Sequence, residues 1–454
     1  QRVLLAMPGA SRQRRNAILT QLRPLGVEVQ TVPQLADIVS GHARVEDVRD
    51  IDVGDILGRD PVPPDQALLS ACVRDKTVLV TGAGGSIGSE LCRQILQLGP
   101  KRLVLFEMSE LALYQIEREL QLLLAGLPSV SGVAPEIVAL IGNAHHKPRM
   151  REIMRTFGVQ TVYHAAAYKH VPIVEHNMIE GIHNNVVSTW YTAEAAIESG
   201  VETFVLISTD KAVNPTNVMG ATKRFAEIVL QALQQTATRT RFCMVRFGNV
   251  LDSSGSVVPL FREQIRAGGP VTVTHPEVMR YFMTIPEAVN LVLQAGSIGR
   301  GGDVFVLDMG KPVRIADLAR RMIELSGFTV RDEANPDGDI EISYTGLRPA
   351  EKLFEELLIG KDVSGTEHPM IMRAVEPRLP WEEVQLMLAD LMVILRRGDC
   401  FAARDLLTRV VREYQPAEDV VDLVHRERRE EGPVEFEVLE LPGRVTDLAT
   451  WRSM

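Results

Sequence analysis

The stretch TVLVTGAGGSIG, at residues 77–88, determines the fold because it joins a strand, a glycine-rich turn and the start of a helix. Residues 77–81 are apolar or β-branched, which is typical of a parallel strand buried on both faces. Gly82 permits the tight turn, Gly85 lets the backbone approach a ligand, and Gly88 lets the helix pack closely on the strand. The pattern therefore predicts a nucleotide-binding βαβ unit.

The helix that begins at Ser86 and Ile87 presents free backbone N–H groups, where a pyrophosphate can bind. The next strand ends at Glu107, and a carboxylate there accepts hydrogen bonds from the adenosine ribose but repels a 2′-phosphate. Small side chains at Ala165 and Ala166 follow a later strand and leave room for a cofactor against the backbone. These features predict a dinucleotide site that takes NAD rather than NADP.

Apolar strands and helical segments alternate along the rest of the central region, which indicates an α/β fold with a Rossmann-type doubly wound parallel sheet. The predicted strands lie at residues 103–106, 137–140, 161–163 and 204–207, and the predicted helices at 90–98, 111–124 and 189–199. His164, after the third of these strands, is interpreted as a packed core histidine. From about residue 260 the strands become shorter, which indicates a smaller C-terminal substrate lobe.

The chain divides into five predicted parts. They are an N-terminal α/β accessory segment at 1–60, a proline-rich linker at 61–75, the NAD-binding Rossmann domain at 76–260, a substrate-binding lobe at 261–380 that shares parts of this domain, and a helical C-terminal extension at 381–454. In the accessory segment, residues 3–7 and 27–29 are predicted strands and 12–22 a helix, without a glycine fingerprint. It is interpreted as a structural or interaction module. The extension is predicted to hold amphipathic helices at 381–397 and 400–414.

The composition restricts the classes of function. The 454 residues are 45% hydrophobic and 24% charged, which suits a globular protein with a sizeable core. The net charge of −10 argues against a nucleic-acid surface, which needs clustered lysine and arginine. The four cysteines stand far apart, so no metal site or disulfide framework is predicted and a reducing, cytoplasmic setting is expected. No run of about 18 apolar residues is present to span a membrane.

A group of chemically active side chains follows the fifth predicted strand. Thr209, Asp210 and Lys211 put a hydroxyl, a carboxylate and an ammonium at a strand's carboxyl end, where ligands bind in open parallel sheets. Lys223 follows on a helix that begins near Met219. This cluster is the candidate catalytic centre.

Several motifs together resemble the extended short-chain dehydrogenase/reductase superfamily, and within it the membrane-associated UDP-N-acetylglucosamine 4,6-dehydratases of polysaccharide biosynthesis. The matching motifs are TGAGGSIG at 81–88, HAAA at 164–167, AYKHVP at 167–172, STDKAVNPTNVMGATKR at 208–224, VRFGNVL at 245–251, GSVVPLF at 255–261, RYFMT at 280–284 and GLRPAEK at 346–352. The resemblance covers roughly residues 76–375. It implies NAD as cofactor, a UDP-sugar substrate, and a homodimer or higher homo-oligomer.

The resemblance also bears on location. Such proteins often carry membrane helices before a degenerate nucleotide-binding-like unit, and this chain begins at Gln1 rather than at a methionine. The expectation is a catalytic portion in the cytoplasm, anchored in the bacterial inner membrane by a missing N-terminal region.

The resemblance assigns roles in an internal redox reaction: hydride leaves sugar C4 for NAD, water is eliminated across C5–C6, and hydride returns to C6. Lys211 is the implied base at C5, Asp210 the acid for the leaving C6 hydroxyl, and Thr209 the partner of the C4 oxygen. Lys223 is implied to hold the nicotinamide ribose and to favour loss of the C4 hydroxyl proton. Burial would have to shift the pKa values of Lys211 and Asp210 toward neutrality, whereas their opposite charges oppose that shift. The sequence leaves open which effect is larger.

Three positions depart from the superfamily pattern. Met219 stands where a tyrosine base is usual, as in the configuration-retaining enzymes, and its thioether cannot exchange a proton. Asn143 replaces an aspartate that contacts adenine, and its amide can still donate and accept hydrogen bonds. Ala350 replaces a common glycine, with no effect that the sequence makes clear.

Residues for the nucleotide sugar also follow from the resemblance. Arg280 and Arg348 are the implied diphosphate clamps, because guanidinium forks match phosphate oxygens. The other implied substrate contacts are Asn249 and Glu351 beside the nucleotide, and Lys169 and His170 beside the sugar.

Two other classes of function stay open. A C5-inverting dehydratase or a nucleotide-sugar 4-epimerase is the nearer alternative, but Met219 disfavours both because such enzymes use tyrosine. A non-catalytic NAD-binding scaffold is the second alternative. The intact cluster of Thr209, Asp210 and Lys211 disfavours it, since a scaffold needs no acid and base there.

Overall fold

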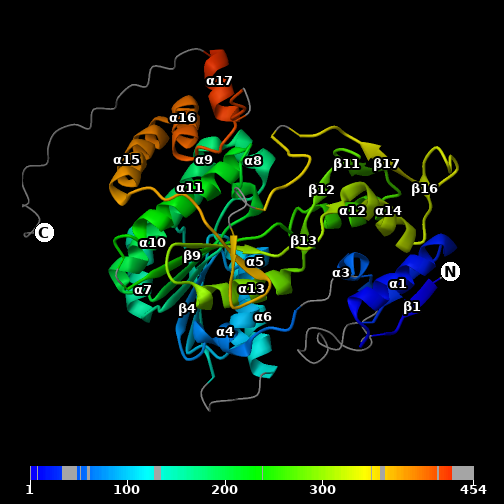
Figure 1. The fold of residues 1–454 in the computed structure, drawn as a ribbon, viewed down its shortest axis with the longest axis horizontal. Coiled ribbons are helices and arrows are strands. Elements are labelled where there is room, and N and C mark those ends of the chain that lie inside the picture. Colours follow the sequence, from blue (N-terminus) through cyan, green and yellow to red (C-terminus); the bar gives the residue numbers. More distant parts are fainter. Residues whose placement is uncertain are drawn as a thin grey trace, which may run out of the picture.

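A mixed sheet forms the centre of the computed structural model (Figure 1). The structure describes residues 2–7, 9–32, 49–51, 53–58, 62–126, 134–237, 239–348, 350–357, 363–416 and 419–431. Within these residues the central sheet has nine strands, in the order β18 (Val363–Gly365), β19 (Ile371–Ala374), β14 (Asp303–Leu307), β9 (Arg241–Arg246), β8 (Thr203–Ile207), β7 (Thr161–His164), β4 (Thr77–Thr81), β5 (Arg102–Glu107) and β6 (Glu136–Ile141).

The described strands from β14 to β6 run parallel, and β19 and β18 add an antiparallel edge. The chain order reverses beside β4, which pairs with β5 on one side and β7 on the other. Open parallel sheets bind ligands at the carboxyl ends of the strands next to such a reversal. The predicted α/β fold with a doubly wound sheet is confirmed, and the reversal locates the candidate site.

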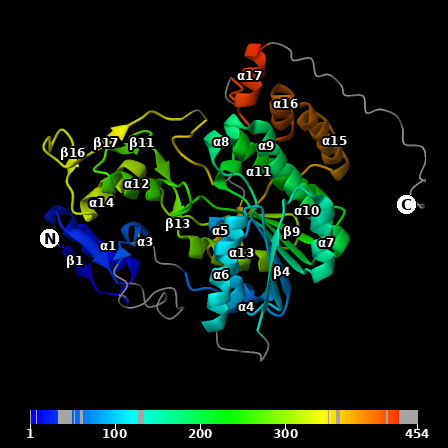
Figure 2. The ribbon, with the colours of Figure 1, turned by 180° about the vertical axis from the view of Figure 1, so that it is seen from behind.

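Helices cover both faces of the sheet (Figures 1 and 2). One face carries α4 (Gln66–Ala71), α5 (Ser86–Gln97), α6 (Glu110–Gly126) and α13 (Ile285–Ile298), and the other carries α7 (Lys147–Phe157), α10 (Ser188–Ser199) and α11 (Val218–Leu233). Successive strand residues point to opposite faces, so Leu79 enters one core cluster while Val78 and Val80 enter the other. Two buried faces explain why the strands are continuously apolar.

A smaller lobe lies beside the carboxyl edge of the sheet. It contains β10 (Asn249–Val250), α12 (Val257–Arg266), β11 (Val271–Val273), β12 (Met279–Arg280), β13 (Phe282–Met283), β15 (Val313–Arg314), α14 (Ile315–Leu325), β16 (Val330–Arg331) and β17 (Ile340–Tyr344). The chain crosses the predicted boundary near residue 260 in both directions. β10 pairs with β13 in the lobe, whereas β14, β18 and β19 return to the central sheet, because strand pairing rather than chain order decides where a segment belongs.

The N-terminal segment packs on this lobe (Figure 1). It consists of β1 (Arg2–Leu5), α1 (Arg12–Leu22), a 3₁₀ turn (Arg23–Leu25), β2 (Glu28–Thr31), β3 (Arg49–Asp50) and α3 (Val53–Leu57). The two predicted strands and the predicted helix of this segment are confirmed. Val29 shares a core cluster with Met322 of α14, and Arg23 Nε lies 2.5 Å from Glu324 Oε2.

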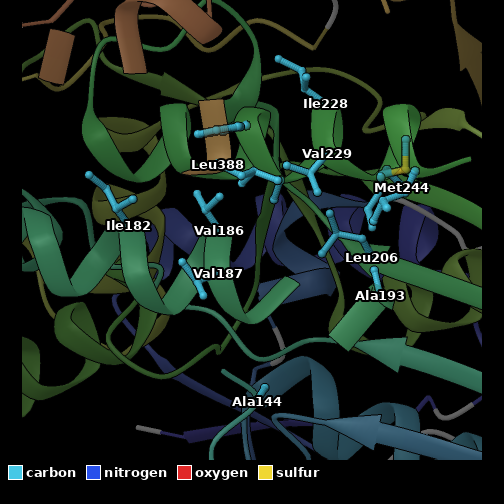
Figure 3. Close-up of a cluster of buried hydrophobic side chains, with 14 of the residues drawn as sticks. Ala144, Ile182, Val186, Val187, Ala193, Leu206, Ile228, Val229, Met244 and Leu388 are labelled. Atoms are coloured by element: carbon cyan, nitrogen blue, oxygen red, sulfur yellow. The ribbon is translucent and has the colours of Figure 1, made fainter. Parts of the chain in front are cut away.

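The C-terminal helices α15 (Trp381–Arg397) and α16 (Cys400–Val410) pack over α11, and α17 (Leu423–Glu431) follows them. Figure 3 labels Leu388 of α15, Val229 of α11 and Leu206 of the sheet, which belong to one core cluster. The two predicted helices are confirmed, and residues 432–454 of the predicted extension lie outside the described residues. Among the described residues, no helix combines the length and apolar character that crossing a bilayer requires.

Candidate active site

The glycine loop between β4 and α5 leaves no space for side chains at two positions. A Cβ on Gly82, whose φ is +67°, would lie 2.8 Å from the backbone nitrogen of Ala166. A Cβ on Gly88 would lie only 1.9 Å from the carbonyl oxygen of Gly82. Only glycine avoids these clashes, so the loop packs directly on α5 and on the segment after β7.

The first turn of α5 is open to an anion. Its N-cap residue, Gly85, supplies no side-chain cap, and the first N–H groups of a helix lack partners within the helix. Ser86 Oγ accepts a hydrogen bond from Ser254 N at 3.2 Å, which joins this turn to the segment before α12. The turn that contains Ser86 and Ile87 therefore suits a pyrophosphate.

Three predicted cofactor contacts lie at the carboxyl ends of β5, β6 and β7. Glu107 Oε2 accepts a hydrogen bond from Gly84 N at 3.1 Å, which places this carboxylate beside the glycine loop. Asn143 Oδ1 accepts one from His145 N at 3.1 Å, and Ala165 N donates to the last carbonyl of β4 at 3.1 Å. All three residues thus lie at the edge of the sheet that carries the glycine loop.

His164, at the end of β7, is a core residue. It is buried, and its Nδ1 lies 2.8 Å from Thr81 Oγ1. Burial, with a smaller contribution from the charge of Lys223, lowers the pKa of His164 to about 3. The imidazole is therefore neutral near pH 7, and the interpretation as a packed core histidine is confirmed.

The turn after β8 gathers the three candidate catalytic side chains. A 3₁₀ turn at Asp210–Ala212 follows Thr209, whose Oγ1 donates to Asp210 Oδ1 at 2.9 Å. Lys211 Nζ donates to the same Asp210 Oδ1 at 3.1 Å. Asp210 is 1% exposed, and among the described residues its Oδ2 has no hydrogen-bond partner. The hydrogen bonds from Thr209 and Lys211 therefore converge on a single oxygen of this buried carboxylate.

The charges around Lys211 decide its protonation. Burial acts to lower the pKa of Lys211, but the carboxylates of Asp210 and Glu355 more than offset burial, and the pKa is raised above its usual value. Arg280 makes a smaller contribution in the lowering direction. At Lys211 the opposite charges therefore outweigh burial, and Lys211 carries a proton in the ligand-free protein near pH 7.

Helix α11, which carries Met219 and Lys223, packs against the turn that follows β8. Asn217 caps this helix by accepting from Gly220 N at 2.8 Å. Residues four apart share a helix face, so Met219 and Lys223 are neighbours, and both are buried. Burial, partly offset by the charge of Glu227, lowers the pKa of Lys223 to about 8.

The lobe contributes a second charged group, which lies near the turn that holds Thr209, Asp210 and Lys211. This turn is called the catalytic turn for its candidate role. Asn249 Oδ1 accepts a hydrogen bond from Lys211 Nζ at 3.3 Å. Arg280 is 9% exposed, and its Nη2 lies 2.9 Å from Glu351 Oε1. Asn249, Arg280 and Glu351 are thus brought together near the candidate catalytic amine, with Asn249 bonded to Lys211 itself.

Of the three other predicted substrate residues, Arg348 adjoins this group through its backbone, whereas Lys169 and His170 lie between β7 and α8. Arg348 has an exposed side chain, and its backbone N donates to Glu351 Oε2 at 3.2 Å. Lys169 and His170 precede α8 (Val171–His176), and a Cβ on Gly255 would lie 2.5 Å from the His170 ring. Within the described part of the chain, no hydrogen bond or ion pair joins Lys169 or His170 to the catalytic turn.

Sequence reasoning missed two residues of this region. Glu355 faces both Lys211 and Arg280, and its position shortly after the GLRPAEK motif is the signal that could have suggested it. Asn185, in the π-helical turn His183–Val187, donates to Thr222 Oγ1 and to the carbonyl of Tyr168, each at 3.0 Å. A single asparagine within a helix carries no sequence signal of this kind.

Comparisons with known proteins agree with this architecture. The polysaccharide biosynthesis protein family matches residues 78–376. The capsular polysaccharide biosynthesis protein CapD of Staphylococcus aureus is 48% identical over 392 residues, which make up 86% of this chain and 63% of that protein. The chain thus spans less than two thirds of the length of this relative.

Solved structures show the same fold. Pen from Bacillus thuringiensis is 31% identical and covers 70% of this chain and 99% of its own, with a TM-score of 0.58. A double mutant of DesIV, a dTDP-glucose 4,6-dehydratase from Streptomyces venezuelae solved with NAD bound, aligns over 72% of this chain and 99% of its own. Its TM-score of 0.52 at 17% identity shows the fold alone. The chain therefore belongs to the polysaccharide biosynthesis protein family, on a fold shared with a nucleotide-sugar dehydratase.

Proposed function

We propose that the chain is an NAD-dependent 4,6-dehydratase that converts UDP-N-acetylglucosamine to a UDP-4-keto-6-deoxy sugar for surface-polysaccharide synthesis. The observation that carries the proposal is the turn after β8, where Oδ1 of the buried Asp210 carboxylate lies 3.1 Å from the amine of Lys211. An acid and a base this close, at the carboxyl edge beside a glycine loop, suit elimination of water from a sugar bound there.

The residues present fit NAD. The tight loop at Gly82 and Gly88, the uncapped first turn of α5 and the carboxylate of Glu107 match the needs of a pyrophosphate and an adenosine ribose. Lys223 would hold the nicotinamide ribose. Bound NAD would supply the acceptance of hydride from C4 and its return to C6.

The hydrogen bonds of the turn offer a balanced route for the protons, once Lys211 has released to solvent the proton that it carries in the ligand-free protein. Thr209 Oγ1 takes the C4 hydroxyl proton while giving its own proton to Asp210 Oδ1, to which it already donates at 2.9 Å. Asp210 passes this proton to the departing C6 hydroxyl, and water leaves. Lys211 removes the C5 proton and later returns it to C5.

This route would take over the work of the absent tyrosine. Met219 cannot accept the C4 hydroxyl proton, whereas Thr209 and Asp210 form a path for it that ends at the leaving group. A 4-epimerase or a C5-inverting dehydratase with the usual tyrosine has no need of such a path. We therefore favour a retaining dehydratase over a 4-epimerase or a C5-inverting dehydratase.

Substrate binding would use the lobe. Arg280 and Arg348 would bind the diphosphate through their guanidinium groups, and Asn249 and Glu351 would help to fix the nucleotide. Lys169 and His170, after β7, would border the sugar.

The test is mass spectrometry of UDP-N-acetylglucosamine after incubation with the protein and NAD in deuterated water. Dehydration predicts a product that has lost one water and carries deuterium at C5, since the side chain of Lys211 is 19% exposed and exchanges its protons with solvent. An unchanged mass with an altered sugar configuration would indicate an epimerase. Recovery of unaltered substrate would overturn the proposal and favour the alternative of a non-catalytic NAD-binding scaffold.

A variant locates the chemistry. Lys211→Met should reduce turnover by about 10³-fold or more, because general-base catalysis typically contributes 10²–10⁴-fold. NAD affinity, measured by fluorescence titration, should stay within about twofold of the parent protein, because Lys211 is not among the proposed cofactor contacts. Undiminished turnover would remove Lys211 from the mechanism.

A further inference from the structure

Glu355 occupies the space between the catalytic turn and the proposed diphosphate clamp. Its side chain is 6% exposed, and Oε1 lies 3.7 Å from Lys211 Nζ and 3.7 Å from Arg280 Nε. One carboxylate oxygen is thus shared by the two cations that would meet opposite ends of the substrate. Both distances exceed those of hydrogen bonds, so Glu355 acts on these groups through its charge.

The segment that carries Glu355 is irregular, and contacts from two directions hold it in place. Thr216 Oγ1 donates to the carbonyl of Ala350 at 3.0 Å, and Lys352 Nζ donates to the carbonyl of Val213 at 3.2 Å. Met279 N, on β12, donates to the carbonyl of Leu353 at 3.1 Å. The segment is therefore tied both to the loop after the catalytic turn and to the strand that holds Arg280.

We propose that Glu355 is a positioning residue that sets the spacing between the amine of Lys211 and the guanidinium of Arg280. This inference rests on the proposed function, in which Lys211 meets C5 of the sugar and Arg280 meets the diphosphate. A substrate bound at both points has a limited range of distances between them. The carboxylate holds both cations within that range, although they lie on different elements.

A purely structural ion pair would have a different arrangement. Exposed pairs in this chain, such as Arg314 with Glu277 at 3.7 Å, join surface side chains and contribute little to stability. Glu355 is instead nearly buried, and both of its partners belong to the candidate site. Its removal should therefore alter catalysis as well as folding.

The charge of Glu355 also gives a measurable signature. The groups that face Lys211 are Asp210 and Glu355, which raise its pKa, Arg280, which lowers it, and the neutral Asn249. Lys211 must be neutral to accept the C5 proton, so activity rises with pH until its pKa is passed. Loss of the Glu355 charge lowers that pKa and moves the rising limb of the pH profile to lower pH.

The experiment compares kcat and kcat/KM across pH for the parent protein, Glu355→Gln and Glu277→Gln. Glu355→Gln should lower kcat at the optimum about tenfold and shift the rising limb down by roughly 0.5–1 pH unit. Glu277→Gln removes the same charge from an exposed ion pair in the same lobe. This variant should leave both kcat and the position of the rising limb unchanged. A Glu355→Gln profile that superimposes on the parent profile would overturn the inference.

A second readout does not depend on turnover. The pH dependence of Lys211 acylation, followed by peptide mass spectrometry, should shift to lower pH in Glu355→Gln. If the parent protein fails to dehydrate the sugar but this shift appears, the proposed function fails while the pairing of Glu355 with Lys211 stands. If the parent protein dehydrates the sugar and neither readout moves, the inference alone fails.

Should Glu355→Gln fail to fold, Glu355→Asp retains the charge but shortens its reach. This variant should keep the position of the rising limb and lose kcat. A normal kcat in a folded Glu355→Asp protein would count against a positioning role.

Discussion

Lys223 is a buried ammonium whose protonation opposes folding. Burial lowers its pKa to about 8, whereas an unfolded lysine has a pKa near 10.4. Below pH 8 the residue is protonated in both states, and the folded state bears the full cost of burying the charge. Between about pH 8 and 10.4 the unfolded state binds more protons, so this cost falls as pH rises.

We therefore expect Lys223→Met to stabilise the ligand-free protein near pH 7 by up to about 3 kcal/mol, with a smaller gain at pH 10. The same variant should lose turnover, because Lys223 is the proposed contact of the nicotinamide ribose. Urea unfolding at the two pH values measures the gain. Equal gains in the free energy of unfolding at pH 7 and pH 10 would show that the stabilisation comes from packing of the methionine and not from loss of the buried charge.

At the scale of elements, hydrogen bonds from two distant segments of the chain hold the loop between the catalytic turn and α11. Gln415 N, from the segment after α16, donates to the carbonyl of Pro215 at 2.9 Å. From the other side, Asn214 Nδ2 donates to Glu356 Oε2 at 2.6 Å. The C-terminal helices are thus joined to the site through backbone contacts as well as through the core over α11.

Gln415→Pro removes this backbone donor, since proline has no N–H. We expect kcat to fall several-fold and the free energy of unfolding to fall by about 1–2 kcal/mol. Gln415→Ala keeps the N–H and serves as the matched control for loss of the side chain. Equal effects of the two substitutions would mean that the backbone contact with Pro215 does not support the loop.

At the scale of the whole molecule, four buried charges join the sheet, α11 and the C-terminal helices. Arg246 on β9 lies 2.6 Å from both Glu227 on α11 and Glu376, which precedes α15, and Arg224 lies 3.1 Å from the same two carboxylates. All four side chains are at most 1% exposed. Ser208, next to the catalytic turn, donates to Glu227 at 2.6 Å, so the network reaches the site.

Removing one partner from a buried set of paired charges leaves an uncompensated charge. We expect Glu376→Gln to reduce the free energy of unfolding by about 3 kcal/mol in urea titrations. Glu382→Gln, on the exposed face of α15, should change it by less than about 0.5 kcal/mol. A loss below about 1 kcal/mol for Glu376→Gln would show that solvent relieves the charge.

Features that depend on consecutive residues could be predicted from the sequence, whereas features that depend on distant segments could not. The strands around Leu79 and the turn at Gly82 were predictable because burial on both faces and positive φ each demand particular residue types in consecutive positions. Thr209, Asp210 and Lys211 adjoin in the chain, so their proximity was predictable as well. The return of β14 and β19 to the central sheet was not, since pairing between distant strands leaves no local pattern.

The sequence by itself determined the βαβ architecture, the glycine loop and the grouping of Thr209, Asp210 and Lys211 after β8, because all of these depend on neighbouring residues. Only the tertiary structure decided that Glu355 shares its charge between Lys211 and Arg280, and that opposing charges outweigh burial at Lys211. Those outcomes depend on distances between segments far apart in the chain. Electrostatic energy varies with such distances and with burial, and neither quantity is encoded in local sequence.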